Sequence, residues 1–365
     1  MTNDLLYQIA LTTIPNIGPV QAKILVHHFG DCQNIFKAST KELENLEGIG
    51  TIKAKCIKNF EDFSIAEDEI TFIEKYKIET LFLKDAEYPQ RLLNCYDPPT
   101  LLYYRGNANL NVSRIINIIG TRNHTDYGRQ VTEQLIDELQ SQQVLIVSGL
   151  AYGIDAIAHK AAVQNNLQTV GVLAHGLDTI YPPQHTSLAK QMVLNGGLLT
   201  EFRKETKPDK HNFPRRNRIV AGMADATIVV ETACKGGSMI TAELANGYNR
   251  DVFAFPGKVT DAKSAGCNHL IKNNKAVLLQ DSQQLIETLG WISKKPKRKE
   301  QKELFISLTN DEQILVDILK DKETVHIDEI YIKSGLTSST VAASMLNLEF
   351  QNVLVSLPGK MYKLL

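Results

Sequence analysis

The chain has 365 residues, of which 43% are hydrophobic and 22% charged, and its formal net charge is −1. This length predicts two to three domains, and this balance is typical of a soluble globular protein with a real core. No apolar run approaches the roughly 18 residues of a membrane span, and no signal peptide opens the chain, so a membrane or secreted class is excluded. Five scattered cysteines without a C-x-x-C pair argue against disulfides or a cysteine-rich zinc site and favour a reducing cytoplasm.

The first 63 residues contain a weak internal repeat. Residues 14–18 and 46–50 each end in Ile-Gly and precede a helical pattern, and the two final glycines are 32 residues apart. Each repeat predicts a helix, a tight hairpin that needs glycine, and a second helix. Such units present loop amides to a phosphate without reading bases. Contact with DNA and a small structural bundle therefore both remain open here. A connector is expected over residues 64–113.

From Arg114 the pattern changes to short apolar runs that alternate with amphipathic segments. Continuous Val/Ile/Leu runs suit strands buried on both faces, and the helix-length spacers suit crossover helices. We therefore expect an α/β fold over residues 114–290, with a doubly wound and mainly parallel sheet whose ligands bind at the C-terminal strand ends. The runs are residues 115–119, 144–148, 169–174, 197–200, 226–231 and 251–255.

The C-terminal part begins after a polar, basic linker at residues 291–304. Residues 309–320 predict a helix in which Thr309 is the N-cap and Glu312 completes a capping box. Two further helices and a terminal β-hairpin predict a winged-helix domain over residues 305–365. Its third helix, residues 338–350, contains no Lys or Arg. This favours a protein contact or a degenerate winged helix over binding of duplex DNA in the major groove.

Anion-binding features follow four of the predicted strands. Small residues let backbone amides approach a phosphate, arginines supply forked donors, and an interleaved phenylalanine could stack on a base. One of the four segments, residues 203–218, carries a net charge of +5. Because all four should lie at the same edge of the sheet, we expect a local polyanion site there. The residues concerned are Gly120, Thr121, Arg122, Ser148, Gly149, Phe213, Pro214, Arg215, Arg216, Asn217, Arg218, Lys235, Gly237, Ser238 and Thr241.

Standard enzyme motifs are missing. The loop after residues 115–119 lacks G-x-G-x-x-G, and the chain has no P-loop motif and no H-E-x-x-H. We therefore predict no cofactor, no metal site and no catalytic residue. Glu243 is the one acid that an enzyme hypothesis could use.

The motifs resemble those of the DNA-processing protein A (DprA/Smf) family, in the same order, over roughly residues 85–280. They are IIGTRNHTDYG, SGLAYGIDAIAH, GLDTIYPPQH, FPRRNRIVAGMAD, KGGSMITAE and NRDVFAFPG. The resemblance implies an extended Rossmann-like domain between a helical, helix-hairpin-helix (SAM-like) module and a winged helix. It further implies a non-catalytic protein of natural transformation that binds and shields incoming single-stranded DNA and loads the RecA recombinase.

The resemblance also implies where the DNA and a second copy of the chain would bind. Matched motif by motif, the DNA groove would use residues 120–122, residues 213–218 and the segment from Lys235 to Thr241. Gln168 departs from the basic residue that some members have at that position. The family's homodimer contact would involve Asn268, His269, Leu270 and Ile271.

Two other functions remain open from the sequence. The Gly-Gly, Thr and Glu243 pattern resembles the nucleotide phosphoribohydrolases of the lysine-decarboxylase-like (LOG) group, although Lys235 and its neighbours stand where that group has proline. A winged helix also fits a regulator that binds duplex DNA, but its recognition helix would lack basic residues.

Overall fold

The computed structural model describes residues 2–291, 308–320 and 322–365. These residues form two compact units, Met1–Leu278 and Leu279–Leu365. The predicted linker, residues 291–304, lies outside the described residues except for Trp291. Within the described residues, no helix combines the length and the apolar character needed to cross a membrane.

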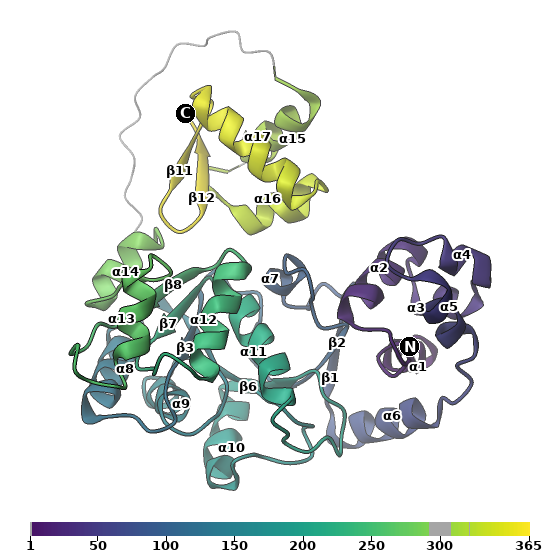
Figure 1. Ribbon diagram of the computed structural model, residues 1–365, viewed down its shortest axis with the longest axis horizontal. Coiled ribbons are helices and arrows are strands. Elements are labelled where there is room, and N and C mark those ends of the chain that lie inside the picture. Colours follow the sequence, from purple (N-terminus) through teal and green to yellow (C-terminus); the bar gives the residue numbers. More distant parts are fainter. Residues whose placement is uncertain (1, 292–307, 321) are drawn as a thin grey trace. The chain divides into compact units, whose positions relative to one another are not determined.

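A nine-stranded, mostly parallel sheet dominates the described part of the first unit (Figure 1). The strand order is β1-β2-β6-β5-β4-β3-β7-β8-β9. The pairs β1–β2 and β2–β6 are antiparallel, and the remaining pairs are parallel. All six predicted strands are confirmed, as is the extended Rossmann-like α/β class. The strands are β1 (Glu79–Phe82), β2 (Leu101–Gly106), β3 (Ile115–Ile119), β4 (Leu145–Ser148), β5 (Thr169–Val172), β6 (Gly196–Thr200), β7 (Ala226–Val229), β8 (Asp251–Ala254) and β9 (Val277–Leu278).

Helices cover both faces of this sheet. The chain leaves β3 in one direction toward β4 and later returns past β3 to β7, so right-handed crossovers place α8 and α9 on one face and α11 and α12 on the other. The point where the direction reverses, between β3 and β7, is the place where such sheets bind ligands. The helices that follow β3 in this unit are α8 (Asp126–Glu138), α9 (Ile154–Gln164), α10 (Thr186–Leu194), α11 (Asn212–Met223), α12 (Gly237–Gly247) and α13 (Ala265–Lys272), whereas α14 (Ser282–Thr288) belongs to the second unit.

The N-terminal helices share one core with the edge of the sheet. The side chains of Phe82, Leu101 and Tyr103 are buried among the apolar residues of these helices. Residues 64–113, predicted only as a connector, therefore contain a helix, two antiparallel strands near the edge of the sheet and a short helix between those strands. They join the N-terminal helices to the sheet. The helices are α1 (Thr2–Leu11), α2 (Pro19–Phe29), α3 (Cys32–Lys37), α4 (Thr40–Glu44), α5 (Gly50–Lys58), α6 (Ser64–Tyr76) and α7 (Gln90–Leu93).

The two hairpins precede α2 and α5 as predicted, but only the second needs its glycine, because Gly18 has φ −96° and the positive φ of the first hairpin (65°) falls on Asn16. Gly50 adopts a positive φ of 62°, a conformation that side chains disfavour. Lys23, on α2, is partly buried and donates hydrogen bonds to the carbonyl oxygens of Leu93 (2.8 Å) and Cys95 (3.1 Å). Burial lowers the pKa of Lys23. The lysine beside the first hairpin therefore holds the helical module against the rest of its unit.

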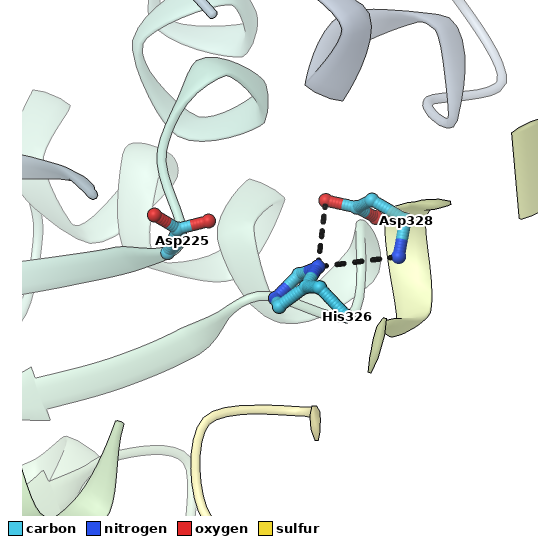
Figure 2. Close-up of side chains that lie close together, drawn as sticks. All are labelled: Asp225, His326 and Asp328. Carbon is cyan, nitrogen blue, oxygen red and sulfur yellow. Dashed lines mark hydrogen bonds and ion pairs between the residues drawn. The ribbon is translucent and has the colours of Figure 1, made fainter. Parts of the chain in front are cut away.

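The second unit has the three helices and the β-hairpin of a winged helix. The predicted capping box is present, because Thr309 N donates to Glu312 Oε2 (2.8 Å) and Glu312 N donates to Thr309 Oγ1 (3.3 Å). Figure 2 shows a second cap, in which His326 Nδ1 accepts from the backbone N–H of Asp328 at 3.2 Å. The elements are α15 (Asn310–Lys320), β10 (Val325–His326), α16 (Ile327–Ser334), α17 (Ser338–Phe350), β11 (Leu354–Leu357) and β12 (Met361–Leu364).

A buried histidine makes the stability of the sheet sensitive to acid. His159, on α9, is fully buried, and its Nδ1 lies 2.7 Å from Thr169 Oγ1. Burial lowers its pKa to about 3, so the native state holds it neutral where the unfolded chain protonates it. Between about pH 6.5 and pH 3 the unfolded state binds the extra proton, which costs roughly 1.4 kcal/mol of stability per pH unit. We expect His159→Gln to remove this component, measured by urea unfolding across that range. Parallel pH profiles for both proteins would contradict the assignment.

Candidate nucleic-acid interface

The predicted loops meet at the C-terminal edge of the sheet, around the ends of β3, β4 and β7. The loop after β3 begins with Gly120 and Thr121, and the backbone N–H of Thr121 donates to the carbonyl of Glu231 (2.7 Å). Arg122 follows in an exposed position, and its guanidinium carbon lies 5.3 Å from the centre of the Phe213 ring. A cation held over an aromatic face at this distance is attracted to the ring. The structure therefore brings together two residues that are far apart in the sequence.

The loop after β4 supports the site from within the protein. Ser148 is fully buried and donates a hydrogen bond to the carbonyl of Ile118 (2.6 Å). Gly149 has no room for a side chain, because a Cβ would lie 2.4 Å from Nη1 of Arg216. Both positions therefore shape the edge of the sheet and present no free side chain to a ligand.

The three arginines at the start of α11 occupy different environments. The sequence predicts one basic strip here, but of these three arginines only Arg215 faces outward, where its side chain is 57% exposed. The guanidinium of Arg216 is buried and donates to the carbonyls of Gly149 and Val172. Arg218 is also buried and pairs with the carboxylate of Glu201 at 2.5 Å. In the chain without DNA, Arg216 and Arg218 are therefore buried and bonded to the protein, and Arg215 is the exposed arginine of the three.

Burial shifts the pKa values of Arg216 and of the nearby Asp155, and the opposite charge of each partner opposes the shift. Burial lowers the pKa of Arg216 to about 10, while the nearby Asp155 carboxylate acts in the opposite direction. Burial likewise raises the pKa of Asp155, and Arg216 opposes that shift. Asn217, beside it on α11, is buried and donates to the carbonyl of Gly237 at 3.3 Å. These groups connect α11 to the loop after β4 and to the start of α12.

The loop after β7 provides an exposed ammonium group and several internally bonded hydroxyls. Lys235 is exposed and has no hydrogen bond or ion pair with the part of the chain that the structure describes. Ser238 Oγ lies 2.7 Å from Thr232 Oγ1, and Thr241 Oγ1 donates to the carbonyl of Gly237 (3.0 Å). The two hydroxyls thus fix the first turn of α12, and Lys235 is the group that faces solvent.

A small cavity opens beside Arg122 and Phe213. Tyr181 approaches Phe213 with ring centres 6.3 Å apart, and Tyr152 is 41% exposed at the rim. Neither tyrosine is among the residues predicted for the site. The only signals in the sequence are that Tyr181 precedes Pro182-Pro183 and that Tyr152 lies in the loop after β4. The chief lining residues are Arg122, Tyr152, His175, Tyr181, Phe213 and Arg216. Rings and guanidinium groups of this kind can stack on bases while the outer cations meet phosphates.

Comparison with known proteins finds three family models along the chain. The family model described as DNA recombination-mediator protein A matches residues 79–290. The chain belongs to the DprA/Smf family. Within this DprA/Smf chain, a helix-hairpin-helix motif model matches residues 8–66 and a DprA winged-helix model matches residues 299–360. The chain is therefore a DNA-processing protein of the recombination-mediator type.

Relatives of the DprA/Smf chain include both full-length and partial matches. Protein Smf of Synechocystis is 33% identical over 98% of each chain. The DNA processing protein DprA of Bacillus subtilis is 42% identical over 53% of this chain and 66% of its own. DprA of Streptococcus pneumoniae has a solved structure with a TM-score of 0.66 and 31% identity, which covers 78% of this chain and 97% of that one. A solved structure of DNA processing protein A of Helicobacter pylori concerns the single-stranded DNA binding mode of that protein. It has 33% identity and a TM-score of 0.54, and it covers 59% of this chain and 96% of that one.

The residues expected at a dimer contact of the DprA/Smf chain lie on and around α13. Leu270 is fully buried in the core of the sheet domain. Asn268 exchanges hydrogen bonds with Gly257, at 3.2 and 3.0 Å. His269 is exposed and Ile271 is half-buried. A contact at this helix would therefore use His269 and Ile271, while Leu270 packs in the core and anchors the helix.

Proposed function

We propose that the protein binds single-stranded DNA across the C-terminal edge of its sheet, protects the strand and loads the RecA recombinase onto it. The observation that supports this most directly is the exposed guanidinium of Arg122 over Phe213, beside an aromatic-lined cavity. Pro214 and Arg215 are exposed next to Phe213 at the start of α11, and Lys235 is exposed at the neighbouring loop. Stacking groups flanked by cations fit a flexible strand whose bases are accessible.

The proposed binding can be tested with three labelled ligands. Fluorescence anisotropy with oligo-dT, a matched duplex and AMP, each across a salt series, compares the competing functions directly. We expect salt-sensitive binding of oligo-dT that exceeds binding of the duplex and of AMP. Preference for the duplex would contradict the proposal in favour of the winged helix or the N-terminal hairpins. A RecA-loading assay on coated DNA then tests the second step.

AMP as the preferred ligand would favour a phosphoribohydrolase. That function would need Glu243, whose side chain is 58% exposed on α12 and lies 3.6 Å from Lys275 Nζ. Among the described residues that line the cavity, none is Asp or Glu. Glu243→Gln should therefore leave oligo-dT affinity nearly unchanged. Loss of a measurable nucleotide hydrolysis in this variant would support the enzyme instead.

Phe213→Ala tests the contribution of the aromatic ring. Truncation removes the ring that would stack on a base, together with its contact to Arg122, but keeps every positive charge, so we expect the loss of about 1–3 kcal/mol of binding energy. The loss should be similar for different strand sequences and should leave the salt dependence unchanged. Anisotropy titrations with oligo-dT and a mixed-sequence strand measure both properties. A variant with wild-type affinity would show that Phe213 does not contact bases.

We also propose a homodimer that forms through α13 and gives one strand two neighbouring grooves, which raises its avidity. The exposed position of His269 and the half-buried position of Ile271 beside it support this location. Sedimentation velocity of the full chain should show a dimer, and Ile271→Glu should shift it toward the monomer. A monomeric wild-type chain would overturn the proposal.

A further inference from the structure

The point where the sheet reverses direction contains a buried carboxylate. Glu231 follows β7 by two residues, and its side chain is fully buried. Oε2 accepts a hydrogen bond from the backbone N–H of Thr125 at 2.9 Å, and Oε1 accepts one from the hydroxyl of Thr125. Thr125 is the N-cap of α8, the helix that follows β3. The carboxylate therefore lies at the positive end of α8, where Rossmann-like sheets ordinarily hold a ligand phosphate.

The surrounding residues are fitted to this carboxylate. At Gly128, in the first turn of α8, a Cβ would lie 2.2 Å from Oε2 of Glu231, so any side chain would collide with it. The N–H of Gly128 donates instead to Thr125 Oγ1 (3.1 Å). The main-chain carbonyl of Glu231 accepts from Thr121 N. The backbone N–H groups of Thr125 and Gly128 and the hydroxyl of Thr125, at the start of this helix, are thus already bonded inside the protein.

We propose that Glu231 is an internal replacement for a ligand phosphate and that it determines which ligands the sheet can bind. A phosphate at the start of α8 would meet a buried negative charge and find Thr125 N already bonded. Anions are therefore restricted to the outer surface near Arg122 and Lys235, which suits a strand and rejects a mononucleotide. The identity of the outer ligand rests on the proposed function, but the exclusion of phosphate does not.

The test uses the full chain with inorganic phosphate and AMP as probes. Thermal unfolding and calorimetry are performed at constant ionic strength, with phosphate exchanged for chloride. The wild type should show no saturable binding of either probe at this position. Glu231→Ala should gain saturable phosphate binding and a phosphate-dependent rise in Tm, because it frees the backbone N–H and the hydroxyl of Thr125 at the start of α8. Saturable phosphate or AMP binding by the wild type that Glu231→Ala leaves unchanged would overturn the proposal.

Two further variants separate this role from a general loss of stability. Glu231→Gln keeps an acceptor for Thr125 N but removes the charge, and it decides by the same readout if the alanine variant does not fold. Thr227→Val is the matched control, since Thr227 is a fully buried β7 residue that accepts a hydrogen bond from Asn117 (2.9 Å) and lies away from the helix start. It should lose stability without gaining phosphate binding. A folded Glu231→Gln or Glu231→Ala protein that gains none would contradict the proposal.

Oligo-dT titrations of the same proteins keep the two proposals distinguishable. Because Glu231 is buried, its glutamine variant should bind oligo-dT within about threefold of the wild type, a difference below 1 kcal/mol. If the wild type binds no strand at all, the proposed function fails. The phosphate measurements would still decide the role of Glu231.

Discussion

Replacing Arg122 and Lys235 together by alanine is expected to lower oligo-dT affinity about 100-fold at moderate salt, with each single change contributing about tenfold. Both side chains are exposed, so their removal should change binding and leave the fold intact. Each lost phosphate contact should also make the slope of log K against log salt shallower by roughly 0.7. Anisotropy titrations at four or more salt concentrations measure the affinity and the slope in the same experiment.

Lys160→Ala is the control for charge alone. Lys160 is exposed on α9, more than one turn beyond the helix start that faces the C-terminal edge of the sheet. This variant loses one positive charge, as each test variant does, but should keep the wild-type slope. An unchanged slope and affinity in the double variant would show that the strand does not bind at these loops.

Arg216→Met is expected to destabilise the protein by about 3–5 kcal/mol, because it removes one partner from a buried charged network. The carbonyls of Gly149 and Val172 would lose their donor, and the buried Asp155 would lose its positive neighbour. Urea unfolding followed by circular dichroism gives the free energy of unfolding directly. The midpoint should fall while the slope of the transition stays the same.

Arg215→Met provides the comparison within the same helix. Its side chain is 57% exposed and lies 3.7 Å from the Glu201 carboxylate, so the change in stability should stay within about 1 kcal/mol. If Arg216→Met instead kept wild-type stability and lost strand binding, Arg216 would be a direct contact that reaches the ligand in the complex.

The central strands of the sheet were predictable because short continuous stretches of the sequence are apolar where both faces of a strand are buried. Val/Ile/Leu runs such as residues 115–119 mark strands that are covered on both faces. β1 and β2 were missed since they lie antiparallel at an edge, where burial depends on helices that come from elsewhere in the chain. The apolar run of residues 101–104 was visible, but it follows a Pro-Pro turn and suggested a connector.

The loops of the candidate site were predictable for the same reason, whereas the roles of the arginines were not. The direction of each side chain depends on where α11 begins and on distant partners, such as Glu201 for Arg218 and Gly149 for Arg216. Composition alone cannot distinguish the buried Arg216 from the exposed Arg215, which directly precedes it in the chain. Glu231 was hidden likewise, because its two hydrogen bonds reach Thr125, more than a hundred residues earlier in the chain.

The order of strands in the sheet also determines which strand partners are synthesised early and which late. β2 pairs with β6, so Tyr103 lies opposite Thr200, and the ribosome completes β2 long before its partner exists. β1 and the N-terminal helices, which cover one edge and one face of β2, both precede it in the chain, whereas β6, which pairs with its other edge, follows later. Until residues 196–200 have been synthesised, the backbone groups along that edge of β2 have no partner in this sheet, and open strand edges are where chains pair wrongly.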